Sequence, residues 1–280
     1  MDALPTRTIV TPVGSVRIYD SQSAKPCVMF VPDGPNVIEH YQALFALLTP
    51  HFRVVCFDMP GFGFSLPEAT YTHTLDQGAR AVIGLLDQLQ IERATLAFSC
   101  ANGFYAMRAA QLAPRRIAGL FLSQTPSLRA MHAWARRVIP WPIRVPVLGQ
   151  TVAWLARQKS AHAWYDIALP RETDREPYRR IAQTALSSGG CFCLAGVVQG
   201  LARETSTTLN YIDTRCTMIW GTKDWSHRRT NAESLTECVP NATILRFEDC
   251  GHFPDLEQPS RYAELLIGQT LRSNFRRDRA

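Results

Sequence analysis

The 280-residue sequence lacks several features that mark special classes of protein. No apolar run approaches the roughly 20 residues that a membrane-spanning helix needs, and no internal repeat is present. The first residues show no basic stretch followed by an apolar one, which is the pattern of a secretory signal. With 46% hydrophobic and 19% charged residues, the composition is typical of a globular protein. We therefore expect a cytoplasmic protein with no membrane partner.

Recognisable metal-binding motifs are also missing. The sequence has eight cysteines, but Cys191 and Cys193 are separated by one residue, which fits neither a CxxC redox motif nor ordinary zinc spacing. Several of the other cysteines lie in apolar runs and are expected to be small buried hydrophobic residues. The sequence thus predicts no metal site.

Segments typical of strands and helices alternate through most of the chain. After a predicted hairpin (8–11 and 15–19), short apolar runs typical of buried strands occupy 27–31, 52–57, 94–97, 117–122, 218–220 and 243–247. Helical patterns separate most of these runs, and this alternation is typical of a mostly parallel sheet covered by helices on both faces. Ligands of such sheets bind at the carboxyl ends of the strands. The sequence therefore predicts an α/β protein with its site at that edge.

One segment, 128–211, interrupts the alternation. It has no strand-like run, four of the six tryptophans, and eleven basic residues against five acidic ones, an excess equal to the net charge of +6 of the whole chain. We predict that 128–211 is a helical cap (lid) inserted into a core made of 1–127 and 212–280. The basic surplus is either a solvated face or a landing surface for an acidic partner. No nucleic-acid recognition motif accompanies it, so we expect no nucleic-acid partner.

The stretch 96–114 has the layout of a nucleophile elbow, although it lacks the usual G-x-S-x-G signature. A short strand leads through a tight turn into a helix with a small face of Ala106, Ala110 and Ala113. A side chain at such a turn stands above the sheet, at a helix N-terminus that can hold negative charge. Either Ser99 or Cys100 is at the tip of this turn.

Two further residues follow strands of the same predicted sheet. Asp224 comes just after the strand at 218–220, and His252 just after the strand at 243–247. The chain order of nucleophile, acid and histidine is that of the α/β-hydrolase triad. The sequence resembles the α/β-hydrolase superfamily over nearly its full length, because 52–65 looks like the family's D-x-P-G-x-G-x-S segment and 251–254 like its histidine segment. The resemblance implies that fold, with catalytic Asp224 and His252.

The register around the turn favours Cys100 as the nucleophile. With Cys100 at the family's serine position, the strand and the helix align without a gap. With Ser99 there, both must slip by one residue, and such a slip turns the faces of a buried strand over. Ser99 stays the alternative nucleophile. The oxyanion hole would use the backbone N–H of Ala101 and that of Asp33 or Gly34.

Two positions depart from the family pattern. Phe98 stands two residues before Cys100, where the family has glycine because a side chain crowds the strained turn. Pro32 and Asp33 replace the family's His-Gly. These departures support one alternative from another class, a non-catalytic α/β-hydrolase-like protein that binds a ligand or partner.

A cysteine nucleophile indicates a particular chemistry. A thiol at a helix N-terminus beside a histidine is expected to have a lowered pKa, and acyl exchange between a thioester and a cysteine is close to reversible. The sequence is similar to the cysteine-dependent aminoacyltransferases of nonribosomal peptide pathways. That likeness implies transfer of an aminoacyl or acyl group between phosphopantetheine thioesters of acidic carrier proteins through S-acyl-Cys100, without metal or diffusible cofactor. The alternative enzyme is a serine or cysteine hydrolase, either a thioesterase or an esterase.

Overall fold

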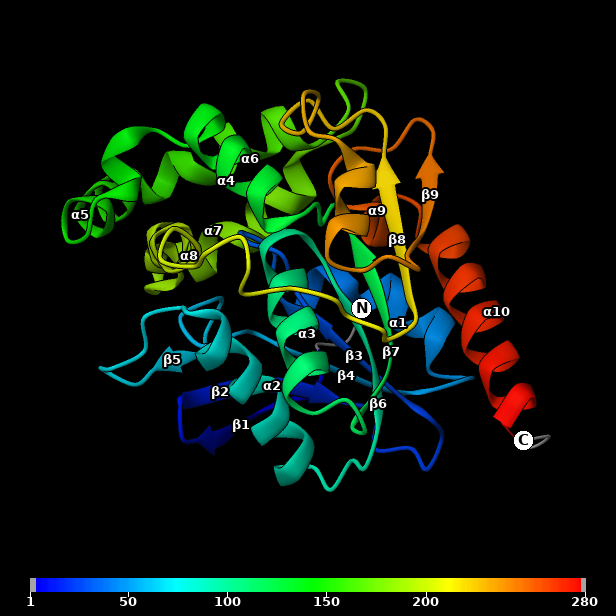
Figure 1. Cartoon of the computed structure of the whole chain (residues 1–280). Helices are drawn as coiled ribbons and strands as arrows, with labels where there is room; N and C mark the ends of the chain where they lie inside the picture. Colours follow the sequence, from blue (N-terminus) through cyan, green and yellow to red (C-terminus); the bar gives the residue numbers. More distant parts are fainter. Residues whose placement is uncertain (1–3, 278–280) are drawn as a thin grey trace.

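A nine-stranded sheet forms the centre of the molecule in the computed structural model, which describes residues 4–277 (Figure 1). Its order is β1-β2-β4-β3-β6-β7-β8-β9, with the short β5 paired to β2. The N-terminal hairpin is antiparallel, and β2 also pairs antiparallel with β4 and β5, whereas every other pair is parallel. The bounds are β1 Thr6–Thr11, β2 Gly14–Asp20, β3 Cys27–Val31, β4 Arg53–Phe57, β5 Leu66–Pro67, β6 Ala94–Phe98, β7 Ile117–Ser123, β8 Cys216–Gly221 and β9 Thr243–Phe247.

Helices cover both faces of this sheet. On one face α2 (Leu75–Gln88) and α3 (Cys100–Leu112) pack into a large buried apolar cluster. On the other face α1 (Gln42–Leu48) and α10 (Pro259–Arg277) contribute to a second cluster, and the short α9 (Pro254–Glu257) precedes α10. The mostly parallel sheet covered by helices on both faces, expected from the alternating pattern, is confirmed.

The described chain between β7 and β8 contains helices and loops but no strand. It forms α4 (Leu128–Val138), α5 (Leu148–Leu155), α6 (Arg157–Ala168), α7 (Glu176–Ser187) and α8 (Cys193–Leu201), with 3-10 turns η2 (Trp141–Arg144) and η3 (Gly190–Phe192). These helices lie together beside the carboxyl ends of the strands (Figure 1). We call this helical part the cap.

Most predicted elements agree with the structure to within a few residues. A 3-10 turn, η1 (Ile38–Tyr41), precedes α1. Between β8 and β9, where the alternation of strands and helices predicts a helix, the chain forms instead the 3-10 turn η4 (Ala232–Glu237). Six residues between the cap residue Asn231 and Cys238 leave little length for regular α-helical bonding. Among the described residues no single helix has the length and apolar character to span a membrane, and the one pair that passes together, Glu176–Ser187 with Gly190–Leu201, is bent by 99°.

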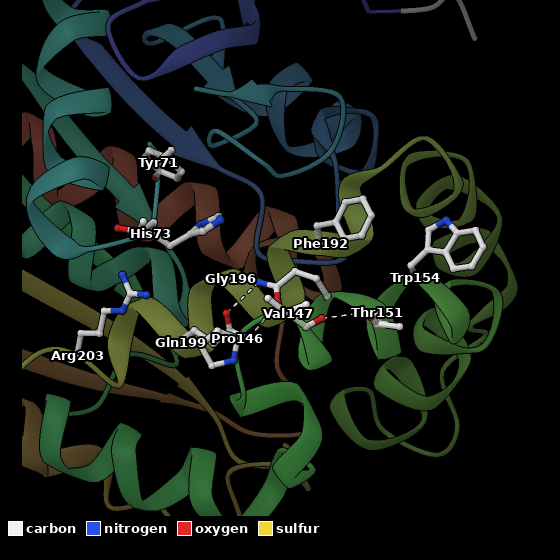
Figure 2. A pocket seen from close by; sticks show the side chains of 12 residues that line it. Tyr71, His73, Pro146, Val147, Thr151, Trp154, Phe192, Gly196, Gln199 and Arg203 are labelled. Atoms are coloured by element: carbon white, nitrogen blue, oxygen red, sulfur yellow. Dashed lines mark hydrogen bonds between the residues drawn. The ribbon is translucent and has the colours of Figure 1, made fainter. Parts of the chain in front are cut away.

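The cap and the core enclose a pocket of about 740 Å³ that we call the His73 pocket (Figure 2). Tyr71 and His73 come from the loop before α2, while Trp154 comes from α5 and Gly196 from α8. A side chain at Gly196 would overlap the ring of His73, so glycine is required where α8 meets this imidazole. None of the predicted triad residues lines the His73 pocket.

Candidate active site

Cys100 stands at the tip of the turn between β6 and α3. It is the first residue of α3, and its φ of +50° lies in the left-handed region, which a residue other than glycine enters only at a strained turn. The preceding residue, Ser99, is extended and occupies the N-cap position without a capping hydrogen bond from its side chain. This backbone is the strained strand-to-helix geometry of a nucleophile elbow, and it presents Cys100 to a cavity under the cap.

Ser99, the alternative nucleophile, faces elsewhere. Its hydroxyl donates to Asp255 Oδ2 at 3.3 Å, and its backbone pairs with Ser123 of β7. Ser99 is not among the residues that line the cavity, whereas Cys100 is. The structure therefore brings Cys100, rather than Ser99, to the predicted site.

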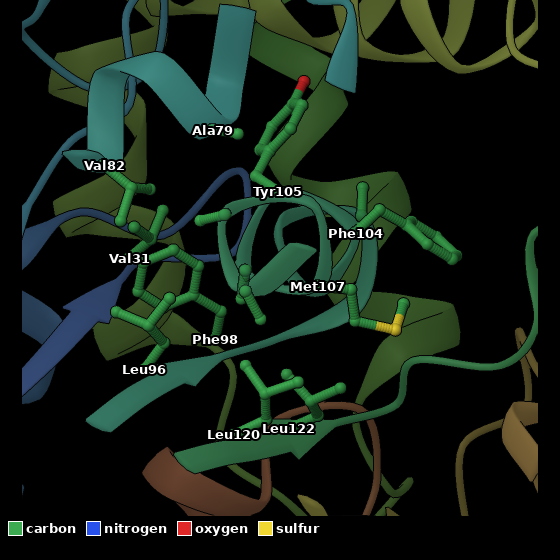
Figure 3. Close-up of a cluster of buried hydrophobic side chains, with 14 of the residues drawn as sticks. Val31, Ala79, Val82, Leu96, Phe98, Phe104, Tyr105, Met107, Leu120 and Leu122 are labelled. Carbon is green, nitrogen blue, oxygen red and sulfur yellow. The ribbon is translucent and has the colours of Figure 1, made fainter. Parts of the chain in front are cut away.

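Phe98 does not obstruct the turn. Its fully buried ring packs among apolar side chains that include Val31, Val82 and Leu96 (Figure 3), and it meets Phe57 edge-on at 6.0 Å between ring centroids. The side chain thus points into the core beneath the elbow, away from the cavity. The crowding inferred from the sequence is relieved by this packing.

His252 lies in the loop after β9 and is held firmly. Its Nδ1 is 2.6 Å from Asp224 Oδ2, and its backbone N–H donates to the Ala168 carbonyl of the cap at 2.8 Å. Glu257 accepts the N–H groups of both neighbours of His252 at 2.8 and 2.9 Å. The Cys100 sulfur and a ring nitrogen of His252 lie within 4.8 Å of each other. The three residues predicted as a triad therefore meet at one edge of the sheet.

Asp224 is fixed by partners that sequence reasoning missed. Gln124, directly after β7, donates to Asp224 Oδ2 at 2.6 Å and accepts from the Gly221 N–H at 2.9 Å. Ser226 donates to the other carboxylate oxygen through both its N–H and its hydroxyl. Burial alone would raise the pKa of Asp224, but the charge of His252 and the hydrogen bonds from His252 and the Ser226 side chain lower it to about 2. The only available signal for Gln124 was a polar residue at the end of a buried strand.

Asp33 occupies an unexpected place. The sequence predicts that its backbone N–H, or that of Gly34, is an oxyanion donor. In the structure the Asp33 carboxylate lies 2.9 Å from His252 Nε2 and also accepts from the Gly34 N–H. The expected oxyanion donor Gly34 is thus taken by the side chain of Asp33. Burial raises the pKa of Asp33, although His252 opposes this shift.

Two carboxylates therefore flank one imidazole. Burial alone would lower the pKa of His252, but the charge of Asp224 and the hydrogen bonds to Asp224 and Asp33 raise it well above its usual value. The two carboxylates therefore favour the protonated form of His252, which donates from both ring nitrogens. In this state it cannot accept a proton, so Asp33 controls its use as a base.

The expectation of a lowered thiol pKa is wrong for this resting arrangement. Burial and the charge of Asp33 raise the pKa of Cys100 to about 11, despite the opposing effects of His252 and the Ala101 N–H. The sequence indicated a helix N-terminus and a histidine, but it could not show how deeply Cys100 is buried. Cys100 at rest is a neutral thiol.

A second histidine lies beside the triad. His227 stacks between Trp134 and His252, with centroids 4.9 and 5.3 Å away. Neither of its buried ring nitrogens has a hydrogen-bond partner among the described residues. Burial lowers the pKa of His227 to about 3, so its imidazole is neutral. Its position three residues after Asp224 was the only sequence signal for it.

The cavity that Cys100 lines measures about 840 Å³ and is called the Cys100 cavity below. Most of its wall is apolar, with contributions from the core and from α4, α6 and α8. Three basic side chains also line it, Arg136, Arg144 and Lys159, and none has a salt-bridge partner among the described residues. Arg136 and Lys159 are exposed, which places them at the mouth. The cavity therefore suits an apolar group attached to an anionic one.

The chain is similar to known proteins over most of its length. Haloalkane dehalogenase 2 of Mycobacterium bovis is 23% identical over 268 residues, covering 89% of each chain. A 2-hydroxymuconate semialdehyde hydrolase of a Pseudomonas species is 23% identical over 277 residues, covering 93% of this chain and 92% of the relative. The crystal structure of epoxide hydrolase A from Mycobacterium thermoresistibile superposes with a TM-score of 0.79 at 16% identity, covering 96% of this chain and 98% of that one. The sequence model of the Alpha/beta hydrolase family matches residues 28–265, and the chain therefore belongs to that family.

Proposed function

We propose that this protein is a cysteine-dependent acyl hydrolase that cleaves an ester or thioester of an apolar acyl group. The observation that carries the proposal is the strained position of Cys100 at the elbow, within 4.8 Å of a histidine bonded to Asp224. The similarity to a relative named as a 2-hydroxymuconate semialdehyde hydrolase supports water as the final acceptor. The sequence alone favoured transfer to a carrier, and the comparisons support the hydrolase alternative better.

The first step must free His252. Asp224 and Asp33 hold the pKa of His252 above its usual value, so Nε2 must first lose its proton to solvent, which leaves a neutral imidazole. That nitrogen then accepts the thiol proton of Cys100 as the sulfur attacks the substrate carbonyl. Asp224 keeps the ring oriented and stabilises its charge. The backbone N–H of Ala101, at the start of α3, is the donor placed to hold the developing oxyanion.

Collapse of the tetrahedral intermediate completes acylation. The carbonyl–oxygen or carbonyl–sulfur bond of the substrate breaks, and His252 returns its proton to the departing alcohol or thiol. Water then adds to S-acyl-Cys100 with His252 as base, and the carboxylic acid leaves as the Cys100 thiol regains its proton. The mostly apolar wall of the Cys100 cavity supports an apolar acyl chain.

A second candidate is transfer of the acyl group to a thiol on an acidic carrier protein. The unpaired basic side chains Arg136, Arg144 and Lys159 on the Cys100 cavity favour it, because a phosphopantetheine arm carries a phosphate and its carrier a negative surface. Thioester exchange with Cys100 is also nearly reversible, as transfer requires. In this reading the acceptor thiol replaces water in the second half-reaction.

One experiment tests the proposal and separates the two acceptors. Acyl N-acetylcysteamine thioesters of increasing chain length are incubated with the protein, with and without pantetheine or a holo-carrier protein as acceptor. Release of free acid that depends on Cys100, and that an added acceptor does not suppress, supports the hydrolase. Acid release at the same rate with Cys100→Ala would overturn it, and turnover only in the presence of an acceptor would favour the transferase.

A further inference from the structure

We propose that Cys100, His227 and His252 form a binding site for a soft divalent cation of the zinc type, and that the bound cation blocks the acyl chemistry. The inhibitory effect rests on the proposed function, whereas the binding itself does not. No metal site was predicted from the sequence, because the three residues are far apart in the chain and follow no metal-binding spacing.

The three ligand atoms are already close together. One atom each from Cys100, His227 and His252 lies within 4.8 Å of the other two, and all three side chains are buried. A tetrahedral zinc ion with ordinary bond lengths holds such atoms about 3.3 to 3.6 Å apart. For the three ligand atoms to reach this spacing, the side chains must move on the order of 1 Å, and the sheet need not rearrange.

His227 supplies the independent observation that points to a ligand. A neutral imidazole has one donor and one acceptor, and leaving both unbonded in the interior costs free energy. Both ring nitrogens of His227 are buried without a partner among the described residues, while the rings of Trp134 and His252 fix its plane. The neutral ring has a free lone pair that a cation would engage.

The surroundings also fit a cation. Asp224 bonds Nδ1 of His252, the carboxylate–histidine arrangement that commonly supports a metal-bound imidazole. Asp33 lies 2.9 Å from Nε2, so its carboxylate would balance the added charge when Nε2 turns to the metal. One thiolate and two imidazoles are a donor set that Zn²⁺ accepts with a fourth position open, and Cys100 faces the cavity through which an ion would enter.

Binding is an exchange of protons for a cation. The S–H bond of Cys100 and the Nε2–H bond of His252 break, metal–sulfur and metal–nitrogen bonds form, and two protons pass to solvent. No atom changes oxidation state. The bound cation occupies the nucleophile and its base together, which removes both from the acylation step.

The test uses Co²⁺ as a spectroscopic probe on the chelator-stripped full-length chain. A thiolate–cobalt charge-transfer band that saturates at one equivalent and is displaced by Zn²⁺ is expected for the wild type. It should disappear with Cys100→Ala and weaken at least tenfold with His227→Phe. Cys193→Ala, which removes another cysteine of the cavity, and His73→Asn, which removes another buried histidine, should leave the band unchanged.

Two results would overturn the site. One is a wild type that shows no charge-transfer band saturating at one equivalent of Co²⁺. The other is a His227→Phe variant whose band is as intense, and whose affinity for Co²⁺ is as high, as in the wild type. If His227→Phe does not fold by circular dichroism, His227→Gln replaces it, with the same loss expected. Zn²⁺ inhibition is measured for each variant against its own metal-free rate, and at least tenfold resistance is expected without His227. A cobalt band in a protein that turns over no acyl substrate would refute the proposed function and leave the cation site standing.

Discussion

Two buried histidines, each beside a large cavity between core and cap, differ in what surrounds them. His73 has no carboxylate against its ring, its Nδ1 lacks a partner among the described residues, and burial lowers its pKa to about 4. His252 is also buried but lies between Asp33 and Asp224, and its pKa is raised well above the usual value. Burial alone therefore lowers the pKa of an imidazole, as at His73. The carboxylates of Asp33, after β3, and Asp224, after β8, raise the pKa of His252 instead.

The largest expected effect is that of removing the nucleophile. Cys100→Ala should lower the acylation rate by about 10⁴-fold, because it removes the sulfur that forms the covalent intermediate. Cys193→Ala, a second buried cysteine on the Cys100 cavity, should stay within about threefold of the wild type. Steady-state release of acid measures both, and comparable losses in the two variants would contradict the assignment.

The next effect bears on the reactive histidine itself. His252→Gln should reduce acylation by about 10³-fold or more, since the thiol, whose pKa is about 11, loses the base that takes its proton. Single-turnover rates across pH check this. The residual rate of the variant should rise with pH as hydroxide removes the thiol proton, and a rate near that of the wild type at neutral pH would refute the role of His252.

Asp33 offers a finer test through the pH profile. The wild-type acylation rate should increase with pH through a value above the ordinary histidine pKa, because His252 acts only when neutral and its pKa is raised. Asp33→Asn removes one negative charge and should move this limb to lower pH by about one unit or more. Asp255→Asn, at a buried carboxylate that bonds Ser99, should leave the limb in place. An unmoved limb in Asp33→Asn would show that Asp33 does not control His252.

The smallest effect is expected at the other histidine. His73→Asn keeps a side chain that tolerates the positive φ of 58° at this position and should change the acylation rate by less than about twofold, because His73 does not line the Cys100 cavity. Acid release together with a thermal melt checks it. A loss in rate with an unchanged melting temperature would show that His73 takes part in the acyl chemistry at the Cys100 cavity, which would contradict the contrast between the two histidines.

The sequence predicted the framework of this site better than its chemistry. The apolar strand runs predicted the sheet. The chain order of nucleophile, acid and histidine predicted which loops at its edge carry the site. The one-residue register argument also placed Cys100 rather than Ser99 at the turn, because alternation in a buried strand leaves only one side chain facing the cavity.

Contacts between distant loops were beyond the sequence. The approach of the Asp33 carboxylate to His252, the bonds of Gln124 to Asp224 and the stacking of His227 depend on where side chains meet after folding. The thiol pKa was predicted in the wrong direction for the same reason, since it depends on how deeply the cap buries Cys100. Helix boundaries inside the cap were not predicted at all.

The most direct test of the central claim is the mass of the intact chain during the first turnover. The protein is mixed with an acyl thioester, quenched in acid, weighed, and digested to locate the added acyl group. We expect a mass gain of one acyl group on Cys100, retained in Ser99→Ala and absent in Cys100→Ala. An acyl group found on Ser99, or a gain that survives Cys100→Ala, would contradict the account.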